Sequence, residues 1–308
     1  MGRGAGVGAD RPGPAKGAGG EVAASGGGVL LAPLCRAYPP GAAKGGGVVR
    51  GLRYHLDLVY ELTKKELKVR YKNSALGYLW SVLNPLAMAG VFYVGLGLII
   101  GVKVPRGQDY PFWLLLICGL FPWQWFSNSV NACTNVYIGN ANLIRKVAFR
   151  REVLPLATVL NDLVHFAVSI PVIVLFLLLA RHRPTPAWLY GLPLLVLAQF
   201  VMTYSVSLVT GALNLFFRDL ANLVQIFLQM LFYMTPIIYS LQWARISAYR
   251  RWLLINPLAS LISGWQRLFL EGRFALGMWQ LAMAYGVAML VVGMLIHRKL
   301  EGKFAEVT

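Results

Sequence analysis

Three side chains of the kinds used in nucleophilic catalysis, Asp162, His165 and Ser169, lie within one otherwise apolar stretch of the chain. Their spacing of i, i+3 and i+7 places them on one face of a helix. A nucleophilic triad needs a base in line with the hydroxyl and a carboxylate behind the base, which side chains stacked along a single helix rarely provide. Ionisable groups in apolar helices usually face a bundle interior or a wet cavity. We therefore interpret the three as a polar patch at a helix interface that lines a pathway, and we expect no catalytic residue.

Metal and disulfide chemistry have little support in the sequence. The four histidines are scattered over the chain and form no cluster of adjacent ligands: His55, His165, His182 and His297. The three cysteines are odd in number and lack metal-binding spacing: Cys35, Cys118 and Cys133. We predict no metal, no cofactor and no structural disulfide in this chain.

Long stretches without Asp, Glu, Lys or Arg are the elements that must position these groups. An apolar helix needs about 20 residues to cross the hydrocarbon core of a bilayer. Six runs are long enough, the third of them interrupted only by Asp162 and His165: 73–102, 111–144, 153–180, 184–217, 220–244 and 274–296. A seventh run, 252–266, contains Asn256-Pro257 and is too short to cross, which predicts a re-entrant or interfacial segment.

Composition agrees with a membrane protein and excludes a soluble one. The chain is 57% hydrophobic and 13% charged, with a mean hydropathy of +0.58. The formal net charge of +17 would suggest a nucleic-acid partner in a soluble protein. Here the basic residues flank the apolar runs, where anionic headgroups attract them. We therefore expect the membrane surface, and no nucleic acid, as their partner.

The distribution of Lys and Arg at the ends of the runs predicts the orientation. One side of the membrane receives thirteen such residues and the other receives nine. Around the first run the counts are five before it and two after it. We therefore place both termini in the cytoplasm.

Two segments outside the spans have helical apolar spacing. Residues 54–71 carry Leu56, Val59, Leu62 and Leu67 between charged residues, which predicts an amphipathic helix on the cytoplasmic face of the membrane; a solvated charged linker is the alternative. Residues 137–152 predict a short cytoplasmic helix or pair of turns whose apolar face rests on lipid or docks into a groove on a soluble partner.

The first fifty residues are rich in glycine and show no periodicity. They predict a disordered segment, 1–50, ahead of a membrane domain, 51–308. A mis-assigned start codon explains this segment as well as any function does. No Gly-Lys-Ser/Thr triplet follows the glycines, so they do not form a phosphate-binding loop.

Aromatic residues are abundant, and most are expected to anchor the helices at headgroup level. Their density near the outer half of the spans permits a second role, because aromatic faces stack on sugar rings. The pathway candidates among them are Trp80, Trp123, Trp125, Tyr233 and Tyr239, beside Asp162 and His165.

Several of these stretches resemble the permease subunits of type-2 ABC exporters of polysaccharides. The likeness runs in order through most of residues 54–308, in the segments 68–85, 119–128, 142–155, 214–219, 234–239, 255–258 and 304–307. In the same order, the sequences of these seven segments are KVRYKNSALGYLWSVLNP, GLFPWQWFSN, NLIRKVAFRREVLP, NLFFRD, MTPIIY, INPL and FAEV.

The resemblance implies an all-α membrane protein with six transmembrane helices, an N-terminal amphipathic interface helix, a cytoplasmic coupling helix and short external helices between spans five and six. It implies a homodimer with two copies of a separate ATP-hydrolysing subunit, which holds the ATP and magnesium. Such assemblies export lipid-linked O-antigen, capsule or teichoic-acid chains across the bacterial inner membrane. The interface helix would flank a lateral gate, and residues 242–272 would lie near the exit.

The resemblance also assigns roles to particular residues. The coupling helix is 140–152, with contact residues Asn140, Asn142, Leu143, Ile144, Arg145, Lys146, Val147, Phe149 and Arg150. Its apolar residues would fill a groove on the ATPase while its basic residues orient the contact. The gate residues, which would meet lipid pyrophosphate, are Lys64, Lys68, Arg70 and Lys72.

Three other functions remain open from sequence alone. The same fold could export a lipophilic drug or a lipo-oligosaccharide. An integral membrane glycosyltransferase would need an acidic pair for a metal–sugar-phosphate complex, and no Asp-x-Asp occurs. A purely structural scaffold would leave the helix at 140–152 without a partner.

Overall fold

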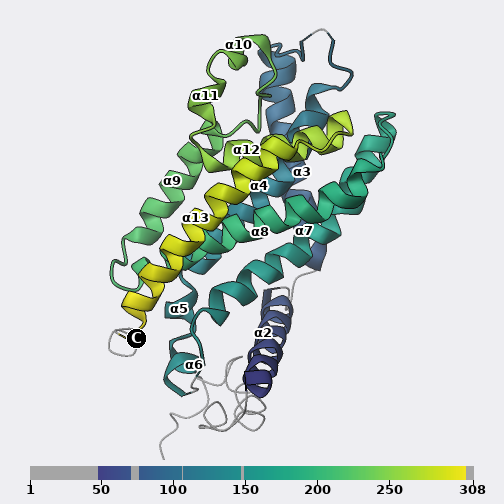
Figure 1. The fold of residues 1–308 in the computed structure, drawn as a ribbon. Helices are drawn as coiled ribbons and strands as arrows, with labels where there is room; N and C mark the ends of the chain where they lie inside the picture. Colours follow the sequence, from purple (N-terminus) through teal and green to yellow (C-terminus); the bar gives the residue numbers. More distant parts are fainter. Residues whose placement is uncertain (1–47, 71–75, 106, 147–148, 303–308) are drawn as a thin grey trace, which may run out of the picture.

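The computed structural model describes residues 48–70, 76–105, 107–146 and 149–302, and the regular structure within them is helical (Figure 1). The predicted disordered segment lies outside these residues, except for its last three, which begin helix α2 (Val48–Arg70). No β-strand occurs in the described ranges. The all-α class is therefore correct for the part of the chain that is described.

Long helices run back and forth along the molecule in alternating directions. The first comprises the short η1 (Gly77–Leu79), α3 (Trp80–Phe92) and the π-helical η2 (Tyr93–Ile99). It is followed by α4 (Phe112–Thr134), α7 (Val153–Leu179), α8 (Ala187–Asn214), α9 (Leu220–Met234) and α13 (Leu276–Glu301). The chain pairs neighbouring passes of this bundle antiparallel.

Among the described residues, four of these stretches are long and apolar enough to cross a membrane: Gly77–Ile99, Val153–Leu179, Ala187–Asn214 and Leu276–Glu301. Helix α4 has 23 residues, about 34 Å at 1.5 Å per residue. Its second half, however, carries Gln124 and Asn128. Helix α9 has 15 residues, about 22 Å, which is shorter than a hydrocarbon core of about 30 Å. Two of the six predicted spans therefore fall outside these four: α4 is more polar, and α9 is shorter.

Helix α9 ends early because of a proline. The predicted run continues to residue 244, but Pro236 disfavours helical geometry at the residue before it. Thr235 accordingly has φ −93° and ψ 139°, and the helix stops at Met234. The chain then turns into a non-crossing segment.

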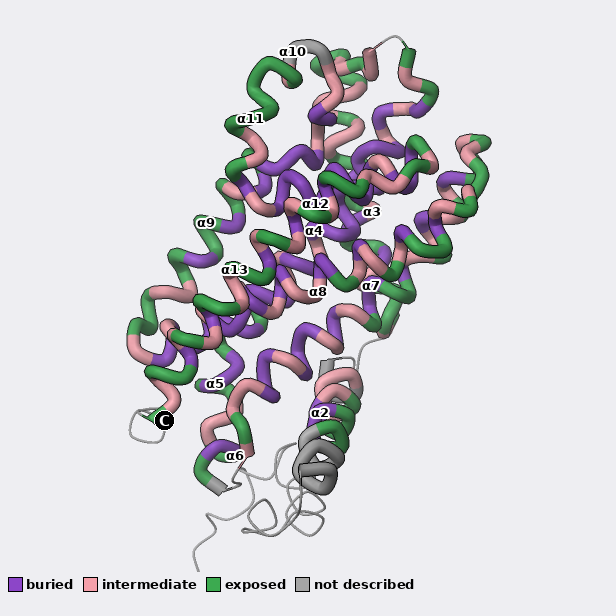
Figure 2. The backbone as a smooth tube through the Cα atoms, viewed as in Figure 1, coloured by how far each residue is buried: buried purple, intermediate pink, exposed green. Residues whose placement is uncertain are grey.

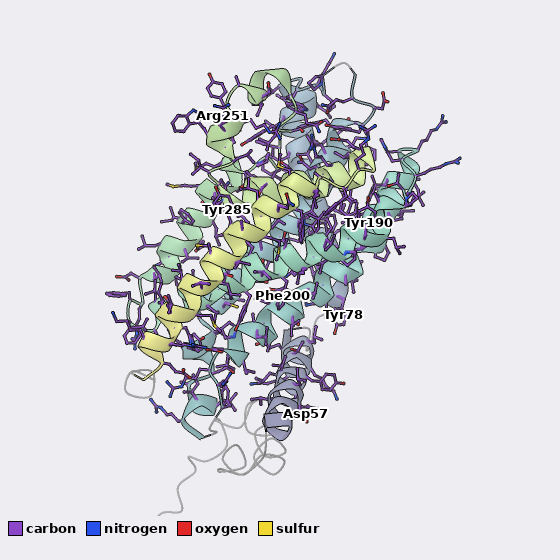
Figure 3. All side chains as sticks on the ribbon, in the orientation of Figure 1. Asp57, Tyr78, Tyr190, Phe200, Arg251 and Tyr285 are labelled. Atoms are coloured by element: carbon purple, nitrogen blue, oxygen red, sulfur yellow. The ribbon has the colours of Figure 1, made fainter. Side chains whose placement is uncertain are left out.

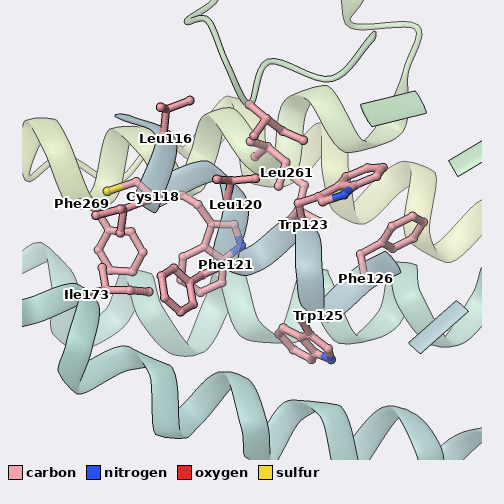
Figure 4. Packing of buried hydrophobic residues seen from close by; sticks show 14 of the residues in the cluster. Leu116, Cys118, Leu120, Phe121, Trp123, Trp125, Phe126, Ile173, Leu261 and Phe269 are labelled. Carbon is pink, nitrogen blue, oxygen red and sulfur yellow. The ribbon is translucent and has the colours of Figure 1, made fainter. Parts of the chain in front are cut away.

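Helix α4 forms the centre of the bundle. Most of its residues are buried, including Leu114, Leu115 and Phe121, and the tube in Figure 2 shows the purple of buried residues concentrated at this level of the molecule. It packs against α3, α7, α8, α9 and the later helix α12. Figure 4 shows its side chains Phe121, Trp123 and Trp125 among neighbours such as Leu261 and Phe269. Burial in protein explains why this helix tolerates polar residues that a lipid-facing span would not.

Helices α8 and α13 lie side by side along much of their length. Small residues permit the close approach: a Cβ on Gly293 would lie 3.0 Å from the carbonyl oxygen of Ser205. The hydroxyl of Ser205 also donates to the carbonyl oxygen of Gly286 at 3.1 Å. Small residues at a helix crossing are typical of packing within membranes.

Short helices fill the connection between α9 and α13. They are α10 (Ala244–Ser247), α11 (Arg250–Leu253), α12 (Pro257–Gln266) and the π-helical η3 (Arg267–Glu271). Asn256 caps α12 by accepting a hydrogen bond from the Leu258 amide at 3.0 Å, and Pro257 occupies the first turn. Trp252 on α11 is 74% exposed, whereas α12 is buried from Leu258 to Gln266. Helix α12 therefore lies inside the protein rather than in the lipid interface.

Two further short helices, α5 (Val136–Gly139) and α6 (Ala141–Lys146), lie at the end of the molecule that also holds α2 and the C-terminal end of α13. Helices α10 and α11 lie at the opposite end. Figure 3 shows the same separation, with Asp57 of α2 and Arg251 of α11 far apart. The described elements thus give the bundle two distinct ends.

The apolar face of α2 packs on protein. Leu58, Val59 and Leu62 are buried in a cluster with residues of α7 such as Leu154 and Ala157. Helix α7 therefore covers this face, and the position of α2 at the cytoplasmic membrane surface stays a prediction. Leu56 and Tyr60 remain exposed on the same helix.

Candidate functional site

A polar pocket lies between α3, α4 and α7 and opens beside α3. Its volume is about 330 Å³. Helix α3 contributes Trp80, Ser81, Asn84 and Pro85; α4 contributes Phe121, Gln124, Trp125 and Asn128; α7 contributes Asp162, His165, Phe166 and Ser169. The structure therefore brings together four of the predicted pathway residues, Trp80, Trp125, Asp162 and His165.

The three polar residues of α7 form part of the pocket wall. Asp162 is 3% exposed, and its Oδ2 accepts a hydrogen bond from the hydroxyl of Ser129 at 2.9 Å. The hydroxyl of Ser169 donates to the backbone carbonyl oxygen of His165 at 2.9 Å, within its own helix. A serine whose proton is held by a carbonyl one turn away does not have the geometry of an activated nucleophile. The arrangement is one of polar lining.

Aromatic rings flank these groups. The indole of Trp125 stacks on the ring of Phe166, with centroids 5.1 Å apart and planes inclined by 24°. The phenol ring of Tyr78 lies 5.5 Å from the imidazole of His165. Trp80 is 49% exposed at the start of α3. The pocket therefore has a buried floor on α4 and α7 and an open rim on α3.

The other aromatic candidates lie outside the pocket. Trp123 is buried on another side of α4, where its ring meets Phe232 edge-on at 5.5 Å. Tyr233 is exposed on α9. The hydroxyl of Tyr239 donates to the carbonyl oxygen of Met234 at 3.1 Å, and burial raises the pKa of this phenol. These three residues do not join Asp162 and His165.

Several polar pocket residues were missed in the sequence: Ser81, Asn84, Gln124 and Asn128. Ser129, which donates to Asp162, was missed as well. A signal for them was present. Amide side chains are costly within a bilayer unless they face protein or water, so Asn84, Gln124 and Asn128 inside charge-free runs could have been grouped with Asp162. The sequence alone did not show that α3, α4 and α7 pack against one another.

A second candidate region is formed by α6 at the end of the molecule that holds α2. Leu143 and Ile144 are only 4% and 9% exposed and pack in one cluster with Leu58 of α2 and Leu154 of α7. Phe149 is half-buried against the same cluster. These apolar residues therefore hold α6 to its own chain, and the prediction that they fill a groove on a partner is corrected for Leu143 and Ile144.

Polar residues form the outward side of this region. Asn142, Arg145 and Arg150 are exposed. Asn140 donates through its amide to the carbonyl oxygen of Val136 at 2.9 Å and so fixes the turn between α5 and α6. Val147 and the side chain of Lys146 lie outside the described residues.

Hydrogen bonds attach α2 to α7. The hydroxyl of Thr158 donates to Oε1 of Glu66 at 2.9 Å, one turn of α7 before Asp162. Of the predicted gate residues, Lys64 is exposed, with its ammonium 5.6 Å from the ring centre of Tyr60. Lys72 and the side chains of Lys68 and Arg70 lie outside the described residues.

Metal binding has no structural support where side chains are described, because no three His, Cys, Asp or Glu side chains come together there. Cys118 and Cys133 are both buried and both free.

The four described helices that are long and apolar enough to cross a membrane indicate a polytopic membrane protein. Comparison with known families identifies the group within this class: residues 57–270 match the ABC-2 type transporter family, and the chain belongs to that family.

Curated relatives cover most of the chain. The O-antigen export system permease protein RfbA of Klebsiella pneumoniae is 41% identical over 257 residues, which span 83% of this chain and 96% of the relative. The protein of the same name from Myxococcus xanthus is 33% identical over 73% of this chain and 85% of its own length. The polysialic acid transport protein KpsM of Escherichia coli is 25% identical over 79% of this chain and 93% of its own.

Proposed function

We propose that this chain is the membrane-spanning permease subunit of an ABC exporter that moves lipid-linked polysaccharide across the bacterial inner membrane. The similarity to RfbA of Klebsiella pneumoniae carries the proposal, because it extends over 96% of the relative's length. The name of that relative, like that of KpsM, concerns surface polysaccharide. These names favour polysaccharide over a lipophilic drug as the cargo. A transport role also fits a pocket whose serine lacks the geometry of a nucleophile.

The proposed topology has six spans: η1–α3–η2, α4, α7, α8, α9 and α13. Their alternating directions place α2, α6 and the end of α13 together. We assign this end to the cytoplasm, because it carries Lys64, Lys65, Arg145 and Arg150. Met1 and Thr308, which lie outside the described residues, are assigned to the same side. Helices α10 and α11 are then external.

Energy comes from a separate ATPase subunit in this proposal. The chain contains no phosphate-loop motif, so ATP and magnesium belong to the partner. Helix α6 is the proposed coupling element, since it lies at the cytoplasmic end and its buried face ties it to α2 and α7. Movement imposed on its exposed side would therefore pass to the cluster and on to α7. The proposed assembly is a homodimer with two ATPase subunits.

The test is affinity purification of the tagged chain from membranes in mild detergent, followed by identification of co-purifying proteins. We expect an ATPase with a phosphate-loop motif to co-purify in equal amount, and its hydrolysis to respond to the permease. Isolation of the folded chain without any ATPase, under several detergents and in nanodiscs, would contradict the proposal.

A further inference from the structure

We propose that the pocket between α3, α4 and α7 binds one pyranose ring of the glycan cargo, within a single subunit. This inference rests on the proposed function for the source of the sugar. It concerns a site on the described part of the chain that the family assignment does not specify.

The size of the pocket fits a single ring. Its volume of about 330 Å³ lies at the lower end of the range for small-ligand sites, about 300–1,000 Å³. This is room for one hydrated sugar ring.

The lining excludes other occupants. No Lys or Arg lines the pocket, and the carboxyl group of Asp162 would repel a phosphate. The described residues offer no group of three metal ligands. A lipid acyl chain would leave the amides of Gln124 and Asn128 without hydrogen-bond partners. A neutral polyol matches this lining, because its hydroxyls both donate and accept.

A buried carboxyl group in the pocket wall supplies an acceptor for a sugar hydroxyl. Asp162 lines the pocket and is 3% exposed, and one of its two oxygens, Oδ2, accepts from the hydroxyl of Ser129. A carboxylate can accept several hydrogen bonds, so Asp162 would also accept from a hydroxyl of the ring.

The rim supplies an aromatic surface and a way in. Trp80 and Asn84 are exposed on α3 at the pocket opening. The C–H face of a pyranose can pack on the exposed indole of Trp80. An amide at an exposed position of a span is costly against lipid, so Asn84 indicates that this side of α3 faces a polar route.

Saturation-transfer difference NMR on the purified permease–ATPase complex in nanodiscs tests the proposal. The probes are the methyl pyranosides of galactose, mannose, N-acetylglucosamine and rhamnose, with sorbitol as a linear control. We expect saturation transfer from the protein to at least one pyranoside, which binds with a Kd in the millimolar range. We expect no saturation transfer to sorbitol. Trp80→Ala and Asn84→Ala should each weaken binding at least fivefold.

The matched control is Tyr233→Ala, which removes another exposed aromatic ring in a span but lies outside the pocket. Binding should be unchanged in this variant. Both aromatic positions are exposed, so folding should survive, and size-exclusion elution and thermal stability verify it. Absence of transfer to all four pyranosides, or equal binding in Trp80→Ala and wild type, would overturn the proposal. If the ATPase still co-purified, the permease assignment would stand without this site.

Discussion

The hydroxyl of Ser129 on α4 donates a hydrogen bond to Oδ2 of Asp162 on α7 at 2.9 Å, and both side chains are buried. This contact joins two helices that pack along each other in the bundle. It supplies a hydrogen-bond partner to a buried carboxyl group. Asp162 also lines the pocket between α3, α4 and α7.

Ser129→Ala should destabilise the protein by about 1.5–3 kcal/mol, because a hydrogen bond to a charged group is lost and the acceptor stays buried. Thermal unfolding in detergent measures the effect. Ser127→Ala on the same helix is the control, since Ser127 is only half-buried. Equal stability of the two variants would mean that water replaces Ser129 at Asp162.

Gly211→Ala should loosen the contact between α8 and α4. A Cβ at this position would lie 2.7 Å from the backbone carbonyl oxygen of Cys133. Overpacking of this kind typically costs about 1–3 kcal/mol, which should appear as a lower Tm. Gly90→Ala is the control, because its Cβ would meet no heavy atom within 4 Å. An unchanged Tm for Gly211→Ala would show that α8 can shift without cost.

At the proposed coupling end, Arg145→Glu should reduce co-purification of the ATPase while leaving the Tm of the permease within the small range typical of surface substitutions. Leu143→Ala should instead lower stability by about 2–5 kcal/mol, because it opens a cavity in the cluster that holds α2, α6 and α7. Lys299→Glu, an exposed change at the end of α13, controls for a general loss of positive charge. Full ATPase recovery with Arg145→Glu would remove the exposed side of α6 from the interface.

Cysteine labelling tests the proposed topology. In a cysteine-free background, Ala248→Cys beside α10 should react with a membrane-impermeant maleimide added outside spheroplasts, and Asn142→Cys on α6 should not. Both positions are exposed in the structure. After permeabilisation both should react, which shows that the second cysteine is accessible in principle. The reverse pattern before permeabilisation would invert the orientation.

Charge-free runs allowed the helical class and the general order of long helices to be predicted, because a bilayer excludes unpaired charge over a fixed length. They could not predict where α9 ends, since the run stays apolar past the Thr235–Pro236 break. The spacing of Asp162 and His165 predicted a shared polar face. That α3 and α4 complete it with Asn84, Gln124 and Trp125 depends on tertiary packing.

Amphipathic spacing likewise predicted helices near residues 54–71 and 137–152, but it could not identify what covers their apolar faces. Lipid, a partner and the same chain all suit such a face. The structure places Leu62 of α2 and Leu143 of α6 in one internal cluster. The exposed basic residues, rather than the apolar ones, are therefore the candidates for contact with the ATPase.

The most direct test of the central claim is ATP-dependent translocation of a lipid-linked glycan in proteoliposomes that contain this chain and its co-purified ATPase. A lectin or glycosidase confined to the lumen reports glycan that has crossed. The account predicts lumenal glycan only when the chain, the ATPase and ATP are all present, with loss of transport when the catalytic carboxylate of the ATPase is replaced. A complex that hydrolyses ATP normally but moves no polysaccharide from its native host, or that moves it equally well without ATP, would contradict the assignment of this chain as the permease of a polysaccharide exporter.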